Sequence, residues 1–409
     1  MSDDYDEIEI NDNDELPSSD ISDDFEEEEN DIPEEDNSFF SYQLPDSALC
    51  VSSNPANSLQ VCAGCLDNSA RLFAVDAAGN PQSTFELLGH TDSVASVKFS
   101  PDGKIVATAS FDRTIRLWSS QDGALITMID DTGSDIEVMA FHPSEPLLVA
   151  GCADGLVWVW EISDEGRAVT LRHMRQGHTH GALIGSVVFL GKGYQGLLST
   201  SEDGVAIVWN LKSGQIVHKT KSFGDQITCA SVHAVKPLYA IGLERGDSYV
   251  IHAESGKVLH KLGGGKGSVE SIEFSACGIL LAVATLEGTL EIWHMDQLNG
   301  YPRHKIDLKS RLPNPQADED REEDTIGFTK VLWHPDQSLR CLITGGKSGR
   351  LDIWNGMTGE HLGSLPGHGE DIMDLVCVEL LDPQNRKVAR VVSVCDGGFV
   401  KMFTLSSQD

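Results

Sequence analysis

Long apolar runs are absent from this sequence of 409 residues. No stretch reaches the roughly 18 consecutive apolar residues of a membrane-spanning helix, so we expect no membrane span. The residues after Met1 are acidic, whereas a secretory signal peptide begins with basic residues followed by an apolar segment. We therefore expect a protein of the cytoplasm or the nucleus.

Basic residues are also scarce, because 30 Lys and Arg stand against 64 Asp and Glu and give a formal net charge of −34. Residues 1–37 contain 19 of the acids and no base, which leaves 45 acids and 30 bases, or −15, in residues 38–409. Such a field repels nucleic-acid phosphates and attracts basic proteins. We expect a basic protein partner and no direct binding of nucleic acid. The alternative for the first segment is that its charge serves only solubility.

Catalytic and metal-binding motifs are missing as well. No G-x-S-x-G, phosphate-binding Walker loop, dinucleotide fingerprint or H-E-x-x-H occurs, so we expect no enzyme. The nine cysteines are odd in number and most lie in apolar runs, which is typical of reduced thiols. Cys62 and Cys65 form a single C-x-x-C without a second pair at ligand spacing. We expect no metal and no other cofactor.

Two regions differ in composition. Residues 1–37 are acidic and poor in large apolar side chains, which predicts a disordered tail, since such a segment cannot bury enough surface to offset its ordering entropy. Residues 38–409 consist of short β-type runs separated by Gly, Asp and Ser, which predicts one folded domain.

Internal repeats organise the folded region. The segments 89–118, 135–160 and 186–209 align almost without gaps, and later segments continue the series. Most units are 42 to 49 residues apart and one interval is 61, a period typical of propeller blades. We predict an all-β, eight-bladed β-propeller. The units close at Phe73, Trp118, Trp160, Trp209, Ile251, Trp293, Trp354 and Phe403.

Each unit contains three strand-like runs followed by a fourth, outer one. The eighth unit ends at Leu405 without an outer strand, so we expect Phe39 to Gln43 to supply it and thereby cover an exposed sheet edge. The long interval contains an insertion at about 300–326, which includes an acidic run and predicts a mobile surface loop. We expect the propeller to be a monomer.

The recurring residues resemble those of the WD40 family. Gly89-His90, Asp112 and Trp118 recur in order as a Gly-His pair, an Asp and a Trp in the fourth unit. The resemblance implies that the turn Asp accepts a hydrogen bond from the loop His, which gives these residues a structural role. The fifth unit departs from the pattern, with Arg245 in place of the Asp and Ile251 in place of the Trp.

A closer similarity lies in residues 135–162, in the final unit at 391–403 and in the acidic first segment. These features resemble the angio-associated migratory cell protein family. Its fungal members are dedicated chaperones for one basic large-subunit ribosomal protein, which they keep soluble for ribosome assembly. The resemblance therefore implies this chaperone function and this class of partner.

Binding residues are expected on the face where loops converge around the propeller axis. One set precedes the turn Asp of each unit and the other precedes each first strand. Together they predict an acidic ring for an Arg- and Lys-rich segment, with an aromatic side chain that can pack on a guanidinium. The alternative is that a protein of this charge displays acids on every face. The predicted partner-binding residues are Asp92, Phe111, Asp135, Glu202, Asp225, Glu244, Glu370, Asp371 and Asp396; Leu66, Ala153, Leu286 and Lys347 are the other residues that precede the turn.

Other binding functions use the same fold, because function lies on the surface of a fold. A signalling or cell-migration scaffold would bind several partners without one dominant basic ligand. A ubiquitin-ligase substrate receptor would carry a helical segment for its adaptor, and none is visible in this sequence.

Overall fold

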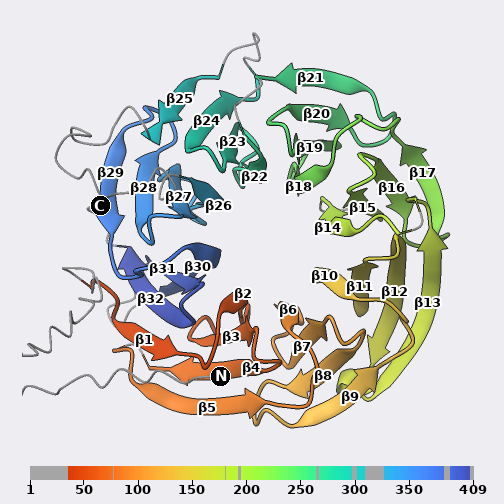
Figure 1. Cartoon of the computed structure of the whole chain (residues 1–409), viewed down its shortest axis with the longest axis vertical. Coiled ribbons are helices and arrows are strands. Elements are labelled where there is room, and N and C mark those ends of the chain that lie inside the picture. Colours follow the sequence, from red (N-terminus) through yellow and green to blue (C-terminus); the bar gives the residue numbers. More distant parts are fainter. Residues whose placement is uncertain are drawn as a thin grey trace, which may run out of the picture. The chain divides into compact units, whose positions relative to one another are not determined.

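The computed structural model describes residues 36–76, 78–179, 181–191, 195–263, 267–296, 302–308, 327–381 and 387–405. Eight four-stranded antiparallel sheets follow one another around a ring, with the first strand of each sheet nearest the centre (Figure 1). The protein is an all-β propeller of eight blades, as the repeat period predicts. Its described part contains no helix with the length and apolarity that crossing a bilayer requires.

The first four blades occupy residues 48–219 and contain one short 3-10 helix, η1 (Asp164–Gly166). Their strands are β2 (Ala48–Ser53), β3 (Gln60–Cys65), β4 (Ala70–Val75), β5 (Pro81–Leu87), β6 (Val94–Phe99), β7 (Ile105–Ser110), β8 (Ile115–Ser119), β9 (Leu125–Ile129), β10 (Ile136–Phe141), β11 (Leu147–Cys152), β12 (Leu156–Ser163), β13 (Ala168–Gln176), β14 (Ile184–Leu190), β15 (Gly196–Ser201), β16 (Ala206–Asn210) and β17 (Gln215–Lys219).

The remaining blades follow the same order, except that the eighth takes its outer strand from the other end of the chain. Their strands are β18 (Ile227–Val232), β19 (Leu238–Leu243), β20 (Ser248–His252), β21 (Val258–Leu262), β22 (Val269–Phe274), β23 (Leu280–Thr285), β24 (Thr289–His294), β25 (His304–Asp307), β26 (Phe328–Trp333), β27 (Cys341–Gly346), β28 (Leu351–Asn355), β29 (His361–Leu365), β30 (Ile372–Leu381), β31 (Lys387–Cys395), β32 (Phe399–Leu405) and β1 (Phe40–Gln43).

The eighth blade is closed by β1, which pairs antiparallel with β32 and aligns Phe40 with Met402. This pairing confirms the predicted role of the segment before the first unit. Phe40 is 5% exposed and meets Phe73 of the first blade edge to face, with ring centroids 5.8 Å apart. The closing strand therefore packs against blade one as well as completing blade eight.

The folded part extends further toward the N-terminus than residue 38. Asp36 forms a 2.5 Å ion pair with the buried Lys401 on β32, and the Asn37 amide donates to the Pro366 carbonyl. These two residues, assigned to the tail by composition, contact the propeller. Residues 1–35, for which disorder is predicted, lie outside the described residues.

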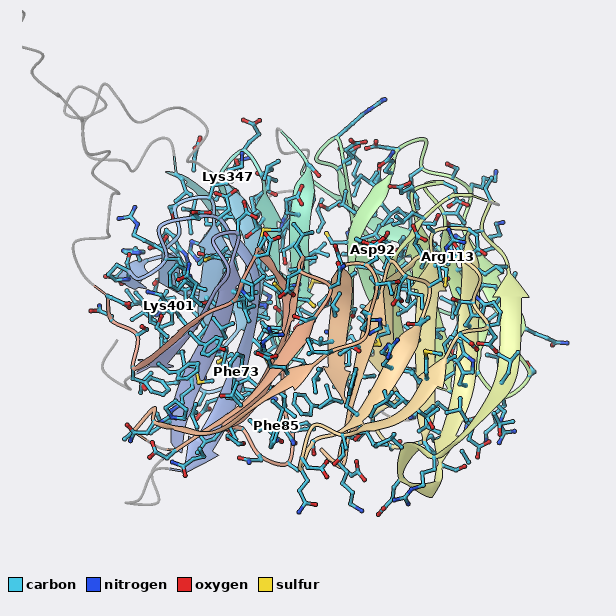
Figure 2. All side chains as sticks on the ribbon, turned by 60° about the horizontal axis from the view of Figure 1, so that its bottom comes forward. Phe73, Phe85, Asp92, Arg113, Lys347 and Lys401 are labelled. Atoms are coloured by element: carbon cyan, nitrogen blue, oxygen red, sulfur yellow. The ribbon has the colours of Figure 1, made fainter. Side chains whose placement is uncertain are left out.

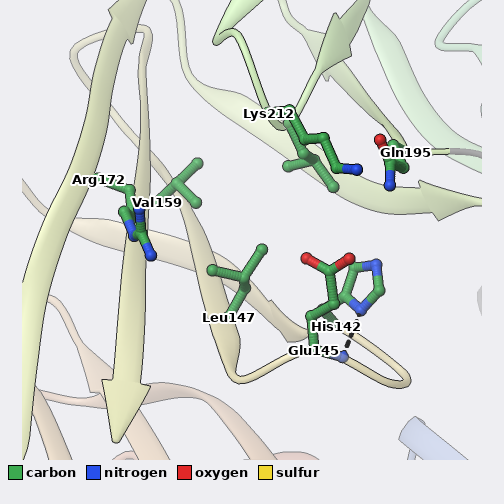
Figure 3. A pocket seen from close by; sticks show the side chains of 8 residues that line it. His142, Glu145, Leu147, Val159, Arg172, Gln195 and Lys212 are labelled. Atoms are coloured by element: carbon green, nitrogen blue, oxygen red, sulfur yellow. Dashed lines mark hydrogen bonds between the residues drawn. The ribbon is translucent and has the colours of Figure 1, made fainter.

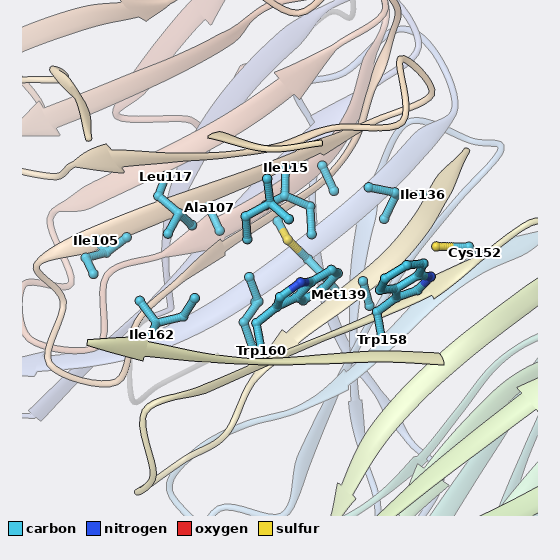
Figure 4. Packing of buried hydrophobic residues seen from close by; sticks show 14 residues of the cluster. Ile105, Ala107, Ile115, Leu117, Ile136, Met139, Cys152, Trp158, Trp160 and Ile162 are labelled. Atoms are coloured by element: carbon cyan, nitrogen blue, oxygen red, sulfur yellow. The ribbon is translucent and has the colours of Figure 1, made fainter. Parts of the chain in front are cut away.

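The core consists of apolar clusters between neighbouring blades. Figure 4 shows one of them, in which Trp158 and Trp160 of β12 stack with ring centroids 5.7 Å apart and face residues of blade two. The alternate residues Val157 and Val159 pack instead with residues of blade four. Successive side chains of a strand point to opposite faces, so each blade needs apolar residues on both.

The outer strand of blade six lies inside the segment of the 61-residue interval that the sequence predicts to be a loop. β25 lies within the segment interpreted as a loop insertion and pairs with β24 to complete blade six. The prediction of a loop from residue 300 onward is wrong for these four residues, of which Ile306 is 1% exposed. The acidic run of the insertion falls in residues 309–326, outside the described part.

Closure by β1 can be tested at Phe40. We expect Phe40→Ala to lower the free energy of unfolding by about 3–5 kcal/mol, because it leaves a cavity between the closing strand and Phe73. Urea unfolding at neutral pH measures this change. The control is Leu125→Ala on outer strand β9, where the side chain is 47% exposed and about 0.5 kcal/mol or less is expected. Equal effects of the two substitutions would contradict the closing role of Phe40.

Candidate partner-binding surface

The upper face of the propeller is formed by the loops that lead into each first strand and by the turns between second and third strands. Figure 2 shows Asp92, Arg113 and Lys347 in these loops, at the upper ends of the strands. In all eight blades, the residue before the turn donates its backbone N–H to the carbonyl just ahead of the first strand, at 2.9 to 3.1 Å. The donors are Leu66, Phe111, Ala153, Glu202, Glu244, Leu286, Lys347 and Asp396, which therefore occupy equivalent positions around the ring.

Side-chain hydrogen bonds fix this loop pair in blade two. Trp118 Nε1 donates to Thr108 Oγ1 at 2.9 Å, the hydroxyl lies 2.7 Å from His90 Nε2, and His90 Nδ1 lies 2.9 Å from Asp112 Oδ2. Burial lowers the pKa of His90 against the opposing effect of Asp112, which favours the neutral imidazole. In this form Nδ1 donates to the carboxylate, which can only accept, and Nε2 accepts from the hydroxyl.

Blade four repeats the network with Trp209, Ser199, His178 and Asp203, the last two at 3.4 Å. Burial lowers the pKa of His178 against the opposing effect of Asp203, which keeps this imidazole neutral too. The Gly-His, Asp and Trp positions are structural, as their resemblance to known repeats implies.

Blade eight retains only part of the network. His368 Nε2 lies 2.7 Å from Ser393 Oγ, whereas Gly397 stands at the position of the turn Asp. The buried Nδ1 atom has no hydrogen-bond partner among the described residues. Burial, aided by the nearby Lys401, lowers the pKa of His368 to about 3.

Three predicted ring acids are exposed and unpaired. Glu202, Glu244 and Glu370 lie on the upper face of blades four, five and eight, and none forms an ion pair within the described part of the chain. They are available to a ligand. Asp92 is likewise exposed, although one of its carboxylate oxygens accepts the Ser93 amide.

Two other predicted acids are engaged by arginines that the sequence prediction missed. Asp135 lies 3.3 Å from Arg113 Nε of blade two. In blade five, Asp225 accepts the backbone N–H of Arg245 at 2.9 Å and lies 3.7 Å from its guanidinium. Asp225 thus holds the turn that lacks its own Asp. The two arginine side chains are 62% and 82% exposed and reduce the negative charge of the ring locally.

The last two predicted acids lie together at blade eight. Asp396 donates its backbone N–H to the Asp371 carbonyl and accepts a 2.5 Å hydrogen bond from Ser47 of blade one. Partial burial raises the pKa of Asp371, and Asp396 adds to this while Lys347 opposes it. A cationic group placed between the two carboxylates would relieve this repulsion.

Further charged side chains lie on the first strands, at positions that the repeat pattern does not predict. Burial and the nearby Asp135 and Glu202 raise the pKa of Glu137 on β10. Deeper along the strands, Lys330 and Asp374 form a 3.1 Å ion pair between blades seven and eight. The negative potential of the upper ring therefore extends inward at blade three and is partly neutralised at blades seven and eight.

One cavity lies away from this ring. It has a volume of about 190 Å³ and lies between blades three and four, near the opposite ends of the strands (Figure 3). Its polar groups are of mixed charge, with Glu145 opposite Arg172 and Lys212. Arg172 is already paired with Glu161, so the cavity offers no uniform field for a charged ligand.

The cysteine pair lies within a blade. Cys62 and Cys65 are both on β3, are fully buried and carry free thiols. Burial raises the pKa of the Cys65 thiol to about 11, which suppresses the thiolate needed for metal binding or redox chemistry. No group of metal-ligating side chains gathers in the residues that the structure covers.

Comparison with known proteins agrees with this geometry. Residues 79–119, 124–161 and 256–294 match the WD40 family, described as WD domain, G-beta repeat. Each match runs from the outer strand of one blade through the third strand of the next. The protein is thus an eight-bladed propeller in which three segments match the WD40 repeat.

Among such propellers, the chain is similar to angio-associated migratory cell protein of Homo sapiens, with 28% identity over 350 residues, covering 80% of this chain and 72% of that protein. In fold it is similar to Sqt1 of Saccharomyces cerevisiae, with a TM-score of 0.77, 20% identity and coverage of 91% of this chain and 100% of the other. Sqt1 of Chaetomium thermophilum, bound to the N-terminus of the ribosomal protein L10, matches at a TM-score of 0.73 with the same identity and coverage.

His368 predicts a pH dependence of stability. Its folded-state pKa of about 3 lies below an unfolded value near 6.5, so the unfolded chain binds a proton first as the pH falls. Its contribution is complete above about pH 6.5 and declines as the pH falls toward 3, by about 2 kcal/mol between pH 7 and 5. Urea unfolding at both pH values measures the free energy of unfolding. Its decline from pH 7 to pH 5 should be smaller in His368→Gln than in the wild type by this amount. Identical declines would contradict the assignment.

Proposed function

We propose that this protein is a dedicated chaperone for a basic large-subunit ribosomal protein, acting as a monomer in the cytoplasm during ribosome assembly. The observation that carries the proposal is the set of exposed, unpaired acids Glu202, Glu244 and Glu370 on one face of a rigid ring. Carboxylates fixed in this way accept charge-assisted hydrogen bonds from Arg and Lys without first releasing an internal partner.

The relatives give the proposal its partner class. A propeller of the same fold, Sqt1 of Chaetomium thermophilum, has been solved with the N-terminus of the ribosomal protein L10. Similarity of fold at 20% identity does not transfer that ligand, so the proposal rests on the chemistry of the upper face. An acidic ring around the axis suits an extended, basic peptide.

The ring would protect such a partner by competing with RNA. Lys- and Arg-rich segments bind phosphate backbones without sequence specificity, through interactions that salt weakens. Carboxylates occupying the same guanidinium and ammonium groups prevent this binding until the partner is handed over. The negative potential over the face also accelerates capture.

Charge reversal tests the proposal. We expect Glu202→Lys, Glu244→Lys and Glu370→Lys, combined, to weaken binding of a basic ribosomal protein by more than about tenfold, because attraction becomes repulsion. The partner is identified as the stoichiometric component that copurifies with the tagged protein at low salt, and its affinity is then measured by calorimetry at two salt concentrations. The wild-type affinity should fall steeply with salt.

A matched control reverses three glutamates on the opposite face. Glu145, Glu254 and Glu360 lie in exposed turns at the other ends of the strands, and their change to Lys alters the net charge by the same amount. We expect this variant to bind nearly as well as the wild type. An equal loss of affinity in both variants would show that only the net charge matters. Binding of many different partners, unaffected by either set of substitutions, would support a general scaffold instead.

A further inference from the structure

Exposed apolar side chains gather in the acidic ring at blades eight, one and two, while Leu286 of blade six is a separate, partly exposed apolar residue. Leu66 of blade one is 43% exposed at the position that Glu202 and Glu244 occupy in blades four and five. Phe111, at the same position in blade two, is partly exposed. Met373 of blade eight is 38% exposed and lies at the upper end of β30, beside the first strand of blade one. We call these three residues the apolar step.

Hydrogen bonds between blades hold the apolar step in place. The Ser93 hydroxyl of blade two donates to the Leu66 carbonyl at 3.4 Å, while the Ser93 carbonyl accepts the Phe111 amide at 3.1 Å. Leu66 and Phe111 are therefore joined through a single serine. Side chains on loops fixed in this way lose little freedom when a ligand covers them.

The same arrangement places a carboxylate next to the apolar step. The Ser47 carbonyl accepts the Leu66 amide at 2.9 Å, and the Ser47 hydroxyl donates to Asp396 of blade eight at 2.5 Å. One serine thus joins the exposed leucine to a ring acid. An apolar group and a carboxylate lie side by side, across the junction of blades eight and one.

Met373 lies at a bulge that recurs in the first strand of all eight blades. The register of β30 against β31 shifts between Ile372 and Asp374, and Met373 has no partner in this ladder. Ile372 is fully buried and Asp374 pairs with Lys330, so Met373 is the residue at this bulge that remains exposed. Bulges re-aim side chains in this manner next to functional surfaces.

We propose that the apolar step receives a bulky apolar side chain of the basic partner, which has Arg or Lys residues on either side of it in sequence. The occupant is argued from charge complementarity, because Asp396 lies beside the step and Glu202 and Glu244 lie farther around the ring. The step sets the register of the basic segment, and the acids bind its flanks. This inference rests on the proposed function and narrows its ligand.

Two synthetic peptides of equal length and equal arginine content test the inference. One carries a phenylalanine between its arginines and the other a serine at that place. We expect the wild-type protein to bind the phenylalanine peptide about tenfold more tightly, as burial of part of an aromatic side chain provides. In the double variant Leu66→Ser and Met373→Ser, the two affinities should become nearly equal.

The serine peptide serves as an internal control for folding, because its affinity should not differ between the wild type and this variant. A second control is Val235→Ser, which removes a 75% exposed apolar side chain from the turn between β18 and β19 on the opposite face and should preserve the tenfold preference.

The possible outcomes distinguish the role of the apolar step from the proposed function. Binding of both peptides by the wild type with equal affinity overturns the apolar step and leaves the proposed function standing. Failure of both peptides to bind overturns the proposed function itself. A wild-type dimer in sedimentation that the double variant abolishes, without any peptide preference, would assign the step to a second copy of the chain.

Discussion

Each sheet of this propeller has two apolar faces, and neither can be buried within its own blade. Alternate residues of β12 show the constraint, since Trp158 and Trp160 need blade two while Val157 and Val159 need blade four. Only a closed ring gives every blade two neighbours. Closure in turn needs β1, whose Phe40 packs against Phe73 of the first blade. The described loops of the upper face rest on this packing between neighbouring blades.

Because the blades are packed in this way, one repeated backbone hydrogen bond places equivalent loop residues around the propeller axis. The bond recurs in all eight blades, so eight side chains stand at equivalent positions around the axis whatever their chemistry. The type of side chain at these positions differs from blade to blade. Glu202 and Glu244 supply charge on one arc, Leu66 and Phe111 supply apolar surface on another, and Lys347 of blade seven lies between the two arcs. A ligand is therefore recognised by the order of side chains around the ring rather than by the fold.

The period and the missing outer strand of the last unit predicted the blade number, the closing strand and the equivalence of the ring positions, because these follow from local patterns. The contacts between loops could not be predicted from these local patterns. Asp225 holds the turn at Arg245 within blade five, and Asp36 pairs with Lys401 of blade eight across 365 positions of sequence, since the folded backbone and no local pattern brings these groups together. β25 was missed because a four-residue strand with one buried apolar side chain has no detectable alternation.

The pairing of β1 with β32 has a consequence for synthesis. During synthesis β1 leaves the ribosome long before β32, with which it forms its ladder, because the paired residues Phe40 and Met402 are far apart in sequence. Until then blade one lacks its final neighbour and the growing chain ends in an open sheet edge, a state prone to intermolecular pairing. The ring can close only once β32 has been synthesised, so a chain interrupted before Phe399 would lack the strand that pairs with β1.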